Sequence, residues 1–146
     1  MEHEALVILS DFAHHPTAIA GALVSLRARW PSHRIIACFE PRSNTAVTNV
    51  FQDAFTEALG EADEILLGEI HRAERIDPSD RLDGPAMILQ LREQGRAAEA
   101  FPTNQALGES LLARNFESEG KTLLVFLSNG SFDGVIGKVA DRFVEK

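Results

Sequence analysis

The sequence predicts an α/β fold: a three-layer, Rossmann-like domain in which a mainly parallel sheet of five or six strands is flanked by helices. Short apolar runs of strand length alternate with longer segments whose apolar side chains recur every three or four positions, which is the pattern of βαβ units. With 146 residues and 45% hydrophobic side chains, the chain can bury a core without metals or disulfides. We therefore expect one domain over residues 1–146.

The apolar runs predict strands at residues 5–9, 34–39, 64–67, 97–101 and 122–127. The first helix is expected to open at Pro16, because proline is favoured at the first helical position, and to end at Pro31. Its inward face would carry Ile19, Leu23, Leu26 and Trp30.

The helices after the second strand are expected from similar patterns. A stripe of apolar residues predicts a helix capped by Gly60, with Val50, Phe51, Ala54, Phe55, Ala58 and Leu59 inward. The polar stretch 69–84 is expected to be a surface loop, and Pro85 to start a short helix. Thr103 or Asn104 would cap a helix reaching about residue 116. The last helix would turn Ile136, Val139, Ala140 and Phe143 inward.

Composition narrows the classes of ligand. A net charge of -8 disfavours nucleic acids and anionic membranes, whose binding depends on Lys and Arg. Cys38 is the single cysteine and lies in an apolar run, so we expect a buried, unreactive thiol. No signal peptide or membrane-spanning stretch is recognisable, and a cytoplasmic location is expected. The expected ligand is a small molecule or another protein.

Polar clusters follow four of the expected strands. Because ligands of open α/β sheets bind at the carboxyl edge, these clusters predict a site there. In order along the chain, they are Asp11-His14-His15, Glu40-Arg42-Ser43-Asn44, Glu69-His71-Arg72 and Ser128-Asn129-Gly130. The loops at the opposite edge have the composition of plain turns.

The segment from Asp11 to Thr17 permits two interpretations. Asp11 could accept hydrogen bonds from ribose hydroxyls, and His14 or His15 could meet a phosphate at the helix start. Alternatively, Asp11 and His15 only cap the turn. Two consecutive histidines rarely converge on one ion, so no metal site is expected.

Several motifs together resemble the C-terminal domain of the Mur ligases of peptidoglycan synthesis. The resemblance covers the whole chain, in order. It rests on Asp11-Phe12-Ala13-His14-His15-Pro16-Thr17, Phe39-Glu40-Pro41-Arg42-Ser43-Asn44-Thr45, Val50-Phe51-Gln52-Asp53, Ala62-Asp63-Glu64 and Ser128-Asn129-Gly130 with Phe132 and Gly134. It is most similar to the branch that joins UDP-N-acetylmuramate to L-Ala-γ-D-Glu-meso-diaminopimelate in murein recycling.

This resemblance implies a three-domain cytoplasmic enzyme that uses ATP and Mg²⁺, with the N-terminal UDP-sugar domain and the central ATPase domain absent from this chain. Gly120-Lys121-Thr122 mimics the end of a P-loop, but it runs from helix into strand, so Gly120 is interpreted as a helix cap. Since the phosphate cradle and the main Mg²⁺ site would lie in the missing central domain, the isolated domain is not expected to be active.

The resemblance also implies roles for individual residues. Asp11 would hold the ATP ribose, and His14 would act as the catalytic residue and, with His15, face phosphate. The tripeptide would be bound by Arg42, Ser43, Asn44, Ser128, Asn129 and Gly130. Arg42 in particular can meet a carboxylate with two hydrogen bonds.

Two alternatives stay open. One is the sibling ligase that adds L-alanine to UDP-N-acetylmuramate, which shares the His-His-Pro-Thr motif, and the other is a stand-alone, non-catalytic binding domain. The chain also departs from the family, since Ser131 and Asp133 add side chains to a last loop that is usually richer in glycine.

Overall fold

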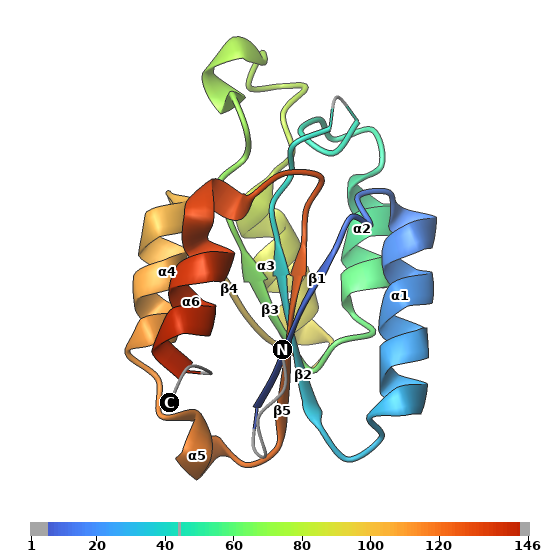
Figure 1. Cartoon of the computed structure of the whole chain (residues 1–146). Helices are drawn as coiled ribbons and strands as arrows, with labels where there is room; N and C mark the ends of the chain where they lie inside the picture. Colours follow the sequence, from blue (N-terminus) through green and yellow to red (C-terminus); the bar gives the residue numbers. More distant parts are fainter. Residues whose placement is uncertain (1–5, 44, 144–146) are drawn as a thin grey trace.

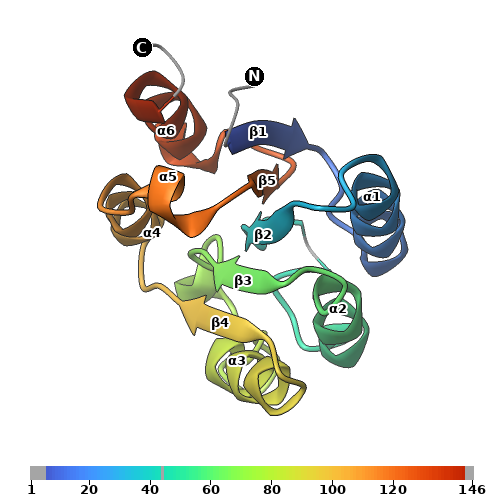
Figure 2. The ribbon, with the colours of Figure 1, turned by 90° about the horizontal axis from the view of Figure 1, so that it is seen from below.

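The computed structural model describes residues 6–43 and 45–143, and the sheet within them has five strands, all parallel. The strands are β1 (Leu6–Asp11), β2 (Arg34–Phe39), β3 (Glu64–Leu67), β4 (Ala97–Ala100) and β5 (Thr122–Leu127). Figure 1 shows the sheet between its helices, and the view in Figure 2 shows the spatial order of the strands, β1-β5-β2-β3-β4. The predicted α/β class and parallel sheet are confirmed.

Helices cover both faces of the sheet, which gives three layers (Figure 2). The helices α1 (Pro16–Arg29), α2 (Gln52–Leu59) and α3 (Gly84–Glu93) pack on one face. On the other face lie α4 (Asn104–Leu112) and α6 (Val135–Phe143), and the short α5 (Phe116–Glu119) precedes β5. Two short 3₁₀ turns, Ala73–Arg75 and Phe132–Gly134, lie in the connections.

The strand order makes neighbouring connections diverge at the carboxyl edge. The connections through α1, α2 and α3 run over one face, whereas the return from β4 to β5 through α4 and α5 runs over the other. As a result, β5 lies between β1 and β2. The chain continues from β1 and β2 into helices on one face of the sheet, but from β5 into α6 on the other face. Open α/β sheets bind ligands where neighbouring connections diverge in this way.

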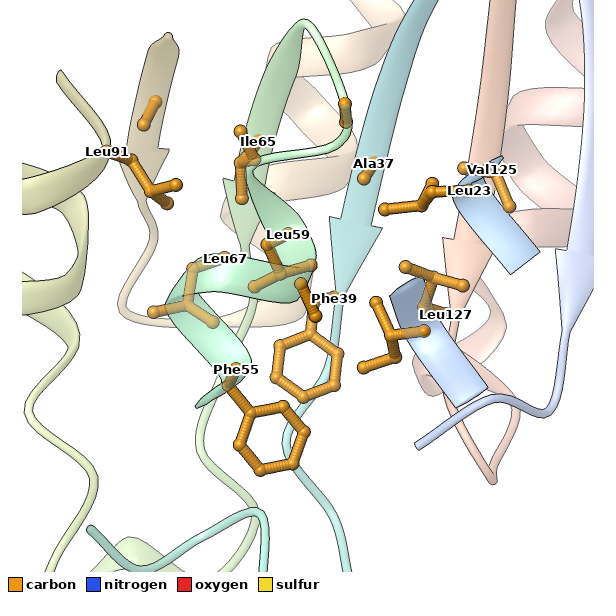
Figure 3. Close-up of a cluster of buried hydrophobic side chains, with 14 of the residues drawn as sticks. Leu23, Ala37, Phe39, Phe55, Leu59, Ile65, Leu67, Leu91, Val125 and Leu127 are labelled. Carbon is orange, nitrogen blue, oxygen red and sulfur yellow. The ribbon is translucent and has the colours of Figure 1, made fainter. Parts of the chain in front are cut away.

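Aromatic pairs anchor the two cores. On one face, the rings of Phe39 and Phe55 stack with their centroids 5.3 Å apart, Leu127 lies beside Phe39, and Leu23 lies near Ala37 and Val125 (Figure 3). On the other face, Phe126 meets Phe132 edge to face at 5.4 Å. Both β2 and β5 therefore have buried side chains on each side, which explains their unbroken apolar sequence.

The inward stripe predicted around α2 is correct only from Phe55 onward. Val50 is 72% exposed and Phe51 38% exposed, and Ala54 is also exposed. The helix begins at Gln52 because the preceding residues are bound to the loop 69–84. Thr48 forms an antiparallel bridge with Arg81, and the Leu82 N–H donates to the Val47 carbonyl at 3.0 Å.

The helix predicted from residue 103 to about 116 is in fact two helices. Thr103 is the N-cap, since its hydroxyl accepts the Ala106 N–H at 3.0 Å. The helix ends at Leu112, and Arg114 in the break donates to the Glu64 carboxylate at 2.9 Å. Gly120 follows α5 with a φ of 85°, which confirms it as a helix cap.

Candidate functional site

The ends of three neighbouring strands are tied together at the carboxyl edge. The Ser128 N–H donates to the Asp11 carbonyl at 3.1 Å, and the Glu40 N–H donates to the Leu127 carbonyl at 3.1 Å. The loops that follow β1, β5 and β2 therefore start side by side, at the upper edge of the sheet in Figure 1. The prediction that these polar clusters share one edge is confirmed.

Asp11 and His15 both make the turn contacts of the simpler interpretation. The Asp11 carboxylate accepts the Ala13 N–H at 2.7 Å, and the His15 Nδ1 accepts the Thr17 N–H at 3.4 Å as the N-cap of α1. Both side chains are nevertheless exposed, so capping leaves them open to a ligand.

The contacts of the two histidines define different proton positions. His14 Nδ1 lies 2.7 Å from the Phe12 carbonyl, which can only accept, so this nitrogen carries a proton. In neutral His14 the outer Nε2 is then an acceptor. His15 Nδ1 accepts a hydrogen bond, so in neutral His15 the proton lies on Nε2, which is a donor. The adjacent imidazoles thus present an acceptor and a donor.

Glu40 lies at the centre of the edge with only 2% of its surface exposed. Ser128 donates to Oε1 at 2.6 Å, while Asn104 and Arg42 donate to Oε2 at 2.8 and 3.4 Å. We refer to Glu40, Arg42, Asn104 and Ser128 as the Glu40 cluster. It joins residues that follow β2 and β5 with the first residue of α4, which are far apart in the sequence.

The Arg42 side chain lies against the backbone of Gly130. A Cβ on residue 130 would be 2.6 Å from Arg42 Nε and 2.8 Å from its Cδ, closer than atoms pack. Arg42 keeps 29% of its side chain exposed. Two predicted members of the site, Arg42 and Gly130, are therefore in direct contact.

The other predicted substrate-binding residues differ in exposure and in their contacts. Ser43 is half-buried and accepts the Ala46 N–H on its hydroxyl at 3.1 Å, so it closes a turn. Asn129 is exposed beside Gly130. Asn44 lies outside the described residues.

Asn104 connects several segments at this edge, and the sequence analysis did not predict that role. It is 2% exposed, and besides contacting Glu40 it donates to Asp133 at 2.9 Å and accepts the Glu69 N–H at 2.8 Å. The one signal in the sequence is a short polar residue at the start of a helix, and it predicts no more than a possible cap.

The turn before α6 explains where the side chain of Asp133 goes. Phe132, Asp133 and Gly134 all have positive φ, at 58°, 53° and 80°. This conformation is unfavourable for the first two residues, and it is held by the buried ring of Phe132 and the Asn104–Asp133 hydrogen bond. The extra carboxylate of this loop therefore binds a neighbouring side chain.

A cavity of about 570 Å³ lies at the ends of β3 and β4, and one of its lining residues, Glu69, is bound to Asn104 of the Glu40 cluster. Glu69 and Phe101 are among its lining residues, and so are Glu74 and Arg81 of the loop 69–84. The His71 N–H donates to the Pro41 carbonyl at 2.9 Å, which fixes this loop beside the residue that precedes Arg42. The volume is in the range of small-molecule sites.

Residues 6–43 and 45–143 contain no group of three or more His, Cys, Asp and Glu side chains that could hold a metal ion. Likewise, none of the helices described in this range is long and apolar enough to cross a membrane.

Comparison with known proteins reveals one family. Residues 1–129 match the family model "Mur ligase, glutamate ligase domain". The chain is 33% identical over 135 residues to a UDP-N-acetylmuramate–L-alanine ligase of Bordetella petrii, and 30% identical over 137 residues to the enzyme of that name from Delftia acidovorans. These matches cover 92% and 94% of this chain but 28% of each relative.

Solved structures share the fold. A murein peptide ligase from Psychrobacter arcticus superimposes with a TM-score of 0.73 at 22% identity, over 94% of this chain and 27% of the other. The UDP-N-acetylmuramate-alanine ligase of Thermotoga maritima gives a TM-score of 0.70 at 17% identity, over 96% and 27%. This chain therefore spans little more than a quarter of its longer relatives.

Proposed function

Since this chain belongs to the Mur ligase family, we propose that it is the C-terminal domain of a ligase joining UDP-N-acetylmuramate to L-Ala-γ-D-Glu-meso-diaminopimelate. Members of the family are ATP-dependent ligases that form C–N bonds. The greater length of the relatives supports a polypeptide that also contains the UDP-sugar and ATPase domains. This domain would close over both.

The observation that favours a tripeptide over a single amino acid is the cavity of about 570 Å³ at the same edge of the sheet as Arg42. Arg42, with 29% of its side chain exposed, offers a guanidinium for a carboxylate, and the cavity, which Arg42 does not line, is far larger than L-alanine needs. A peptide ending in diaminopimelate carries several carboxylates and would extend from Arg42 into this space. In this proposal Ser43, Asn44, Ser128, Asn129 and Gly130 also contribute to binding of the peptide.

Asp11, His14 and His15 fit a nucleotide at the start of α1. Asp11 would accept a ribose hydroxyl, and His15 would donate its Nε2–H to a phosphate oxygen. His14 Nε2, as an acceptor, would take the proton of the attacking amine. ATP supplies the activation of the sugar-linked carboxylate. As the family resemblance implies, Mg²⁺ would be held mainly by the central domain.

The sibling activity is the second candidate, and the names of the relatives favour it. The enzymes that are 33% and 30% identical to this chain are both named for L-alanine addition. A stand-alone binding domain is the third candidate, and an upstream reading frame without a P-loop would support it.

ADP release by the full-length enzyme tests the proposal. We expect release with UDP-N-acetylmuramate and tripeptide, little with L-alanine in place of tripeptide, and none from the isolated chain. The opposite amine preference would assign the sibling ligase. No release with either amine would return the chain to the class of binding domains.

A further inference from the structure

We propose that Glu40 is a positioning residue: together with Gly130, it holds the Arg42 guanidinium in the orientation that meets a substrate carboxylate. This inference rests on the proposed function, in which Arg42 binds the amine substrate. It adds a role for a buried carboxylate that itself has no access to the substrate.

The burial of Glu40 requires an explanation. Removing a carboxylate from water is costly unless hydrogen bonds or an opposite charge compensate for it. Glu40 is 2% exposed and is compensated by Ser128 at 2.6 Å, Asn104 at 2.8 Å and Arg42 at 3.4 Å. The two neutral donors come from the ends of other elements, so they fix the carboxylate relative to the sheet. Arg42 is the one cation among these three partners.

The contacts form a closed ring around Arg42. The Gly130 N–H donates to Ser128 Oγ at 2.9 Å, and the Ser128 hydroxyl donates to Glu40. Glu40 accepts from Arg42, whose side chain lies against the α-carbon of Gly130. A long, flexible side chain is thereby held between a carboxylate and a backbone segment. Ordering it before substrate arrives removes an entropic cost from binding.

The geometry also leaves part of the Arg42 guanidinium available to a substrate carboxylate. Its Nη1 points to Glu40, but 29% of the side chain is exposed at the carboxyl edge. An arginine has five N–H donors in a planar fork, so the donors not used by Glu40 can meet a second carboxylate. Glu40 would thus define which edge of the fork faces the substrate.

Four variants of the full-length ligase test this role: Arg42→Ala, Glu40→Gln, the double variant and Gly130→Ala. Glu40→Gln keeps the shape and one oxygen acceptor but removes the charge. Gly130→Ala leaves Glu40 intact and displaces Arg42 with its Cβ. The measurements are kcat, the KM values for tripeptide and ATP, and the thermal midpoint. Glu61→Gln, an exposed change at the opposite edge of the sheet, is the matched control.

We expect Glu40→Gln and Gly130→Ala each to raise the KM for tripeptide roughly tenfold, with kcat changed less than about twofold and the KM for ATP unchanged. In the Arg42→Ala background, Glu40→Gln should cause no further increase, because Glu40 acts through Arg42. A merely structural role would instead lower the thermal midpoint and affect both substrates.

The outcomes separate the two proposals. A raised KM in Arg42→Ala with wild-type values in Glu40→Gln and Gly130→Ala would overturn the positioning role alone. The positioning role would also be overturned if Glu40→Gln raised the KM for tripeptide equally in the wild-type and the Arg42→Ala backgrounds. A wild-type KM in Arg42→Ala would remove Arg42 from the proposed site, and the role of Glu40 with it. If Glu40→Gln lowers the thermal midpoint, the KM for tripeptide of Gly130→Ala decides whether the orientation of Arg42 matters.

Discussion

Asp63 is hydrogen-bonded twice to Ile35. Its N–H donates to the Ile35 carbonyl at 3.0 Å, and its carboxylate accepts the Ile35 N–H at 2.9 Å. The same carboxylate forms an ion pair with Arg27 of α1. The turn before β3, expected to be plain, therefore joins the end of α1 to the start of β2.

These contacts predict a stability that depends on pH. Partial burial of Asp63 raises its pKa, but the Ile35 N–H and the Arg27 guanidinium outweigh burial and lower the pKa below its ordinary value. The carboxylate therefore stabilises the fold fully above the unfolded-state pKa, and this contribution is lost as the pH falls through the lower folded-state pKa. We expect Asp63→Asn to lower the free energy of unfolding at pH 7 by about 0.5–1 kcal/mol, since the pair is partly screened by solvent.

Urea denaturation of the isolated chain between pH 2 and pH 7 measures this difference. It should shrink toward zero at the acid end of the range. Glu61→Gln, an exposed change in the same turn, is the matched control for removal of a carboxylate. A difference that is constant with pH would mean that the Asp63 charge contributes nothing.

Cys38 should be unreactive in the folded protein. The side chain is fully buried in β2, and burial, followed by the nearby Glu64 carboxylate, raises the pKa of the thiol far above its ordinary value. Because the thiolate is the reactive form, labelling by a thiol reagent at pH 8 should proceed only on unfolding. The rate measured in increasing urea should follow the unfolding transition, whereas rapid labelling without urea would contradict the burial.

Two glycines near α6 should respond oppositely to alanine. Gly134 has a φ of 80°, which L-residues rarely adopt, so Gly134→Ala should destabilise the fold by about 1–2 kcal/mol. Gly137 lies within the helix with nothing close to its Cβ position, so Gly137→Ala should stabilise the fold by about 0.5–1 kcal/mol. Thermal melts of the isolated chain measure both. Shifts of the same sign would contradict this account of the turn.

Asp11 should affect the nucleotide in the full-length ligase. We expect Asp11→Ala to raise the KM for ATP about tenfold, equivalent to one lost hydrogen bond to a ribose, and to leave the KM for tripeptide unchanged. Asp11→Asn is the control, because it keeps an acceptor for the Ala13 N–H. An unchanged KM for ATP in Asp11→Ala would mean that Asp11 only stabilises the turn and does not bind the nucleotide.

Local patterns predicted much of the fold because the responsible interactions are local. Pro16 and Thr103 begin helices through their own backbone and side-chain chemistry, and β2 and β5 are apolar runs of strand length. The same patterns misplaced Val50 and Phe51, which are apolar but exposed. Their conformation follows from the bridge between Thr48 and Arg81, and a periodicity cannot contain such a distant contact.

The sequence by itself determined the α/β class, the parallel sheet and the edge at which its polar residues gather, because the carboxyl ends of parallel strands must point the same way. Only the tertiary structure decided that β5 lies between β1 and β2, and hence that Ser128 and Asn104 meet Glu40 and that Gly130 lies against Arg42. Those contacts join residues far apart in the chain. They depend on strand order and on the connection over the second face, which no local preference encodes.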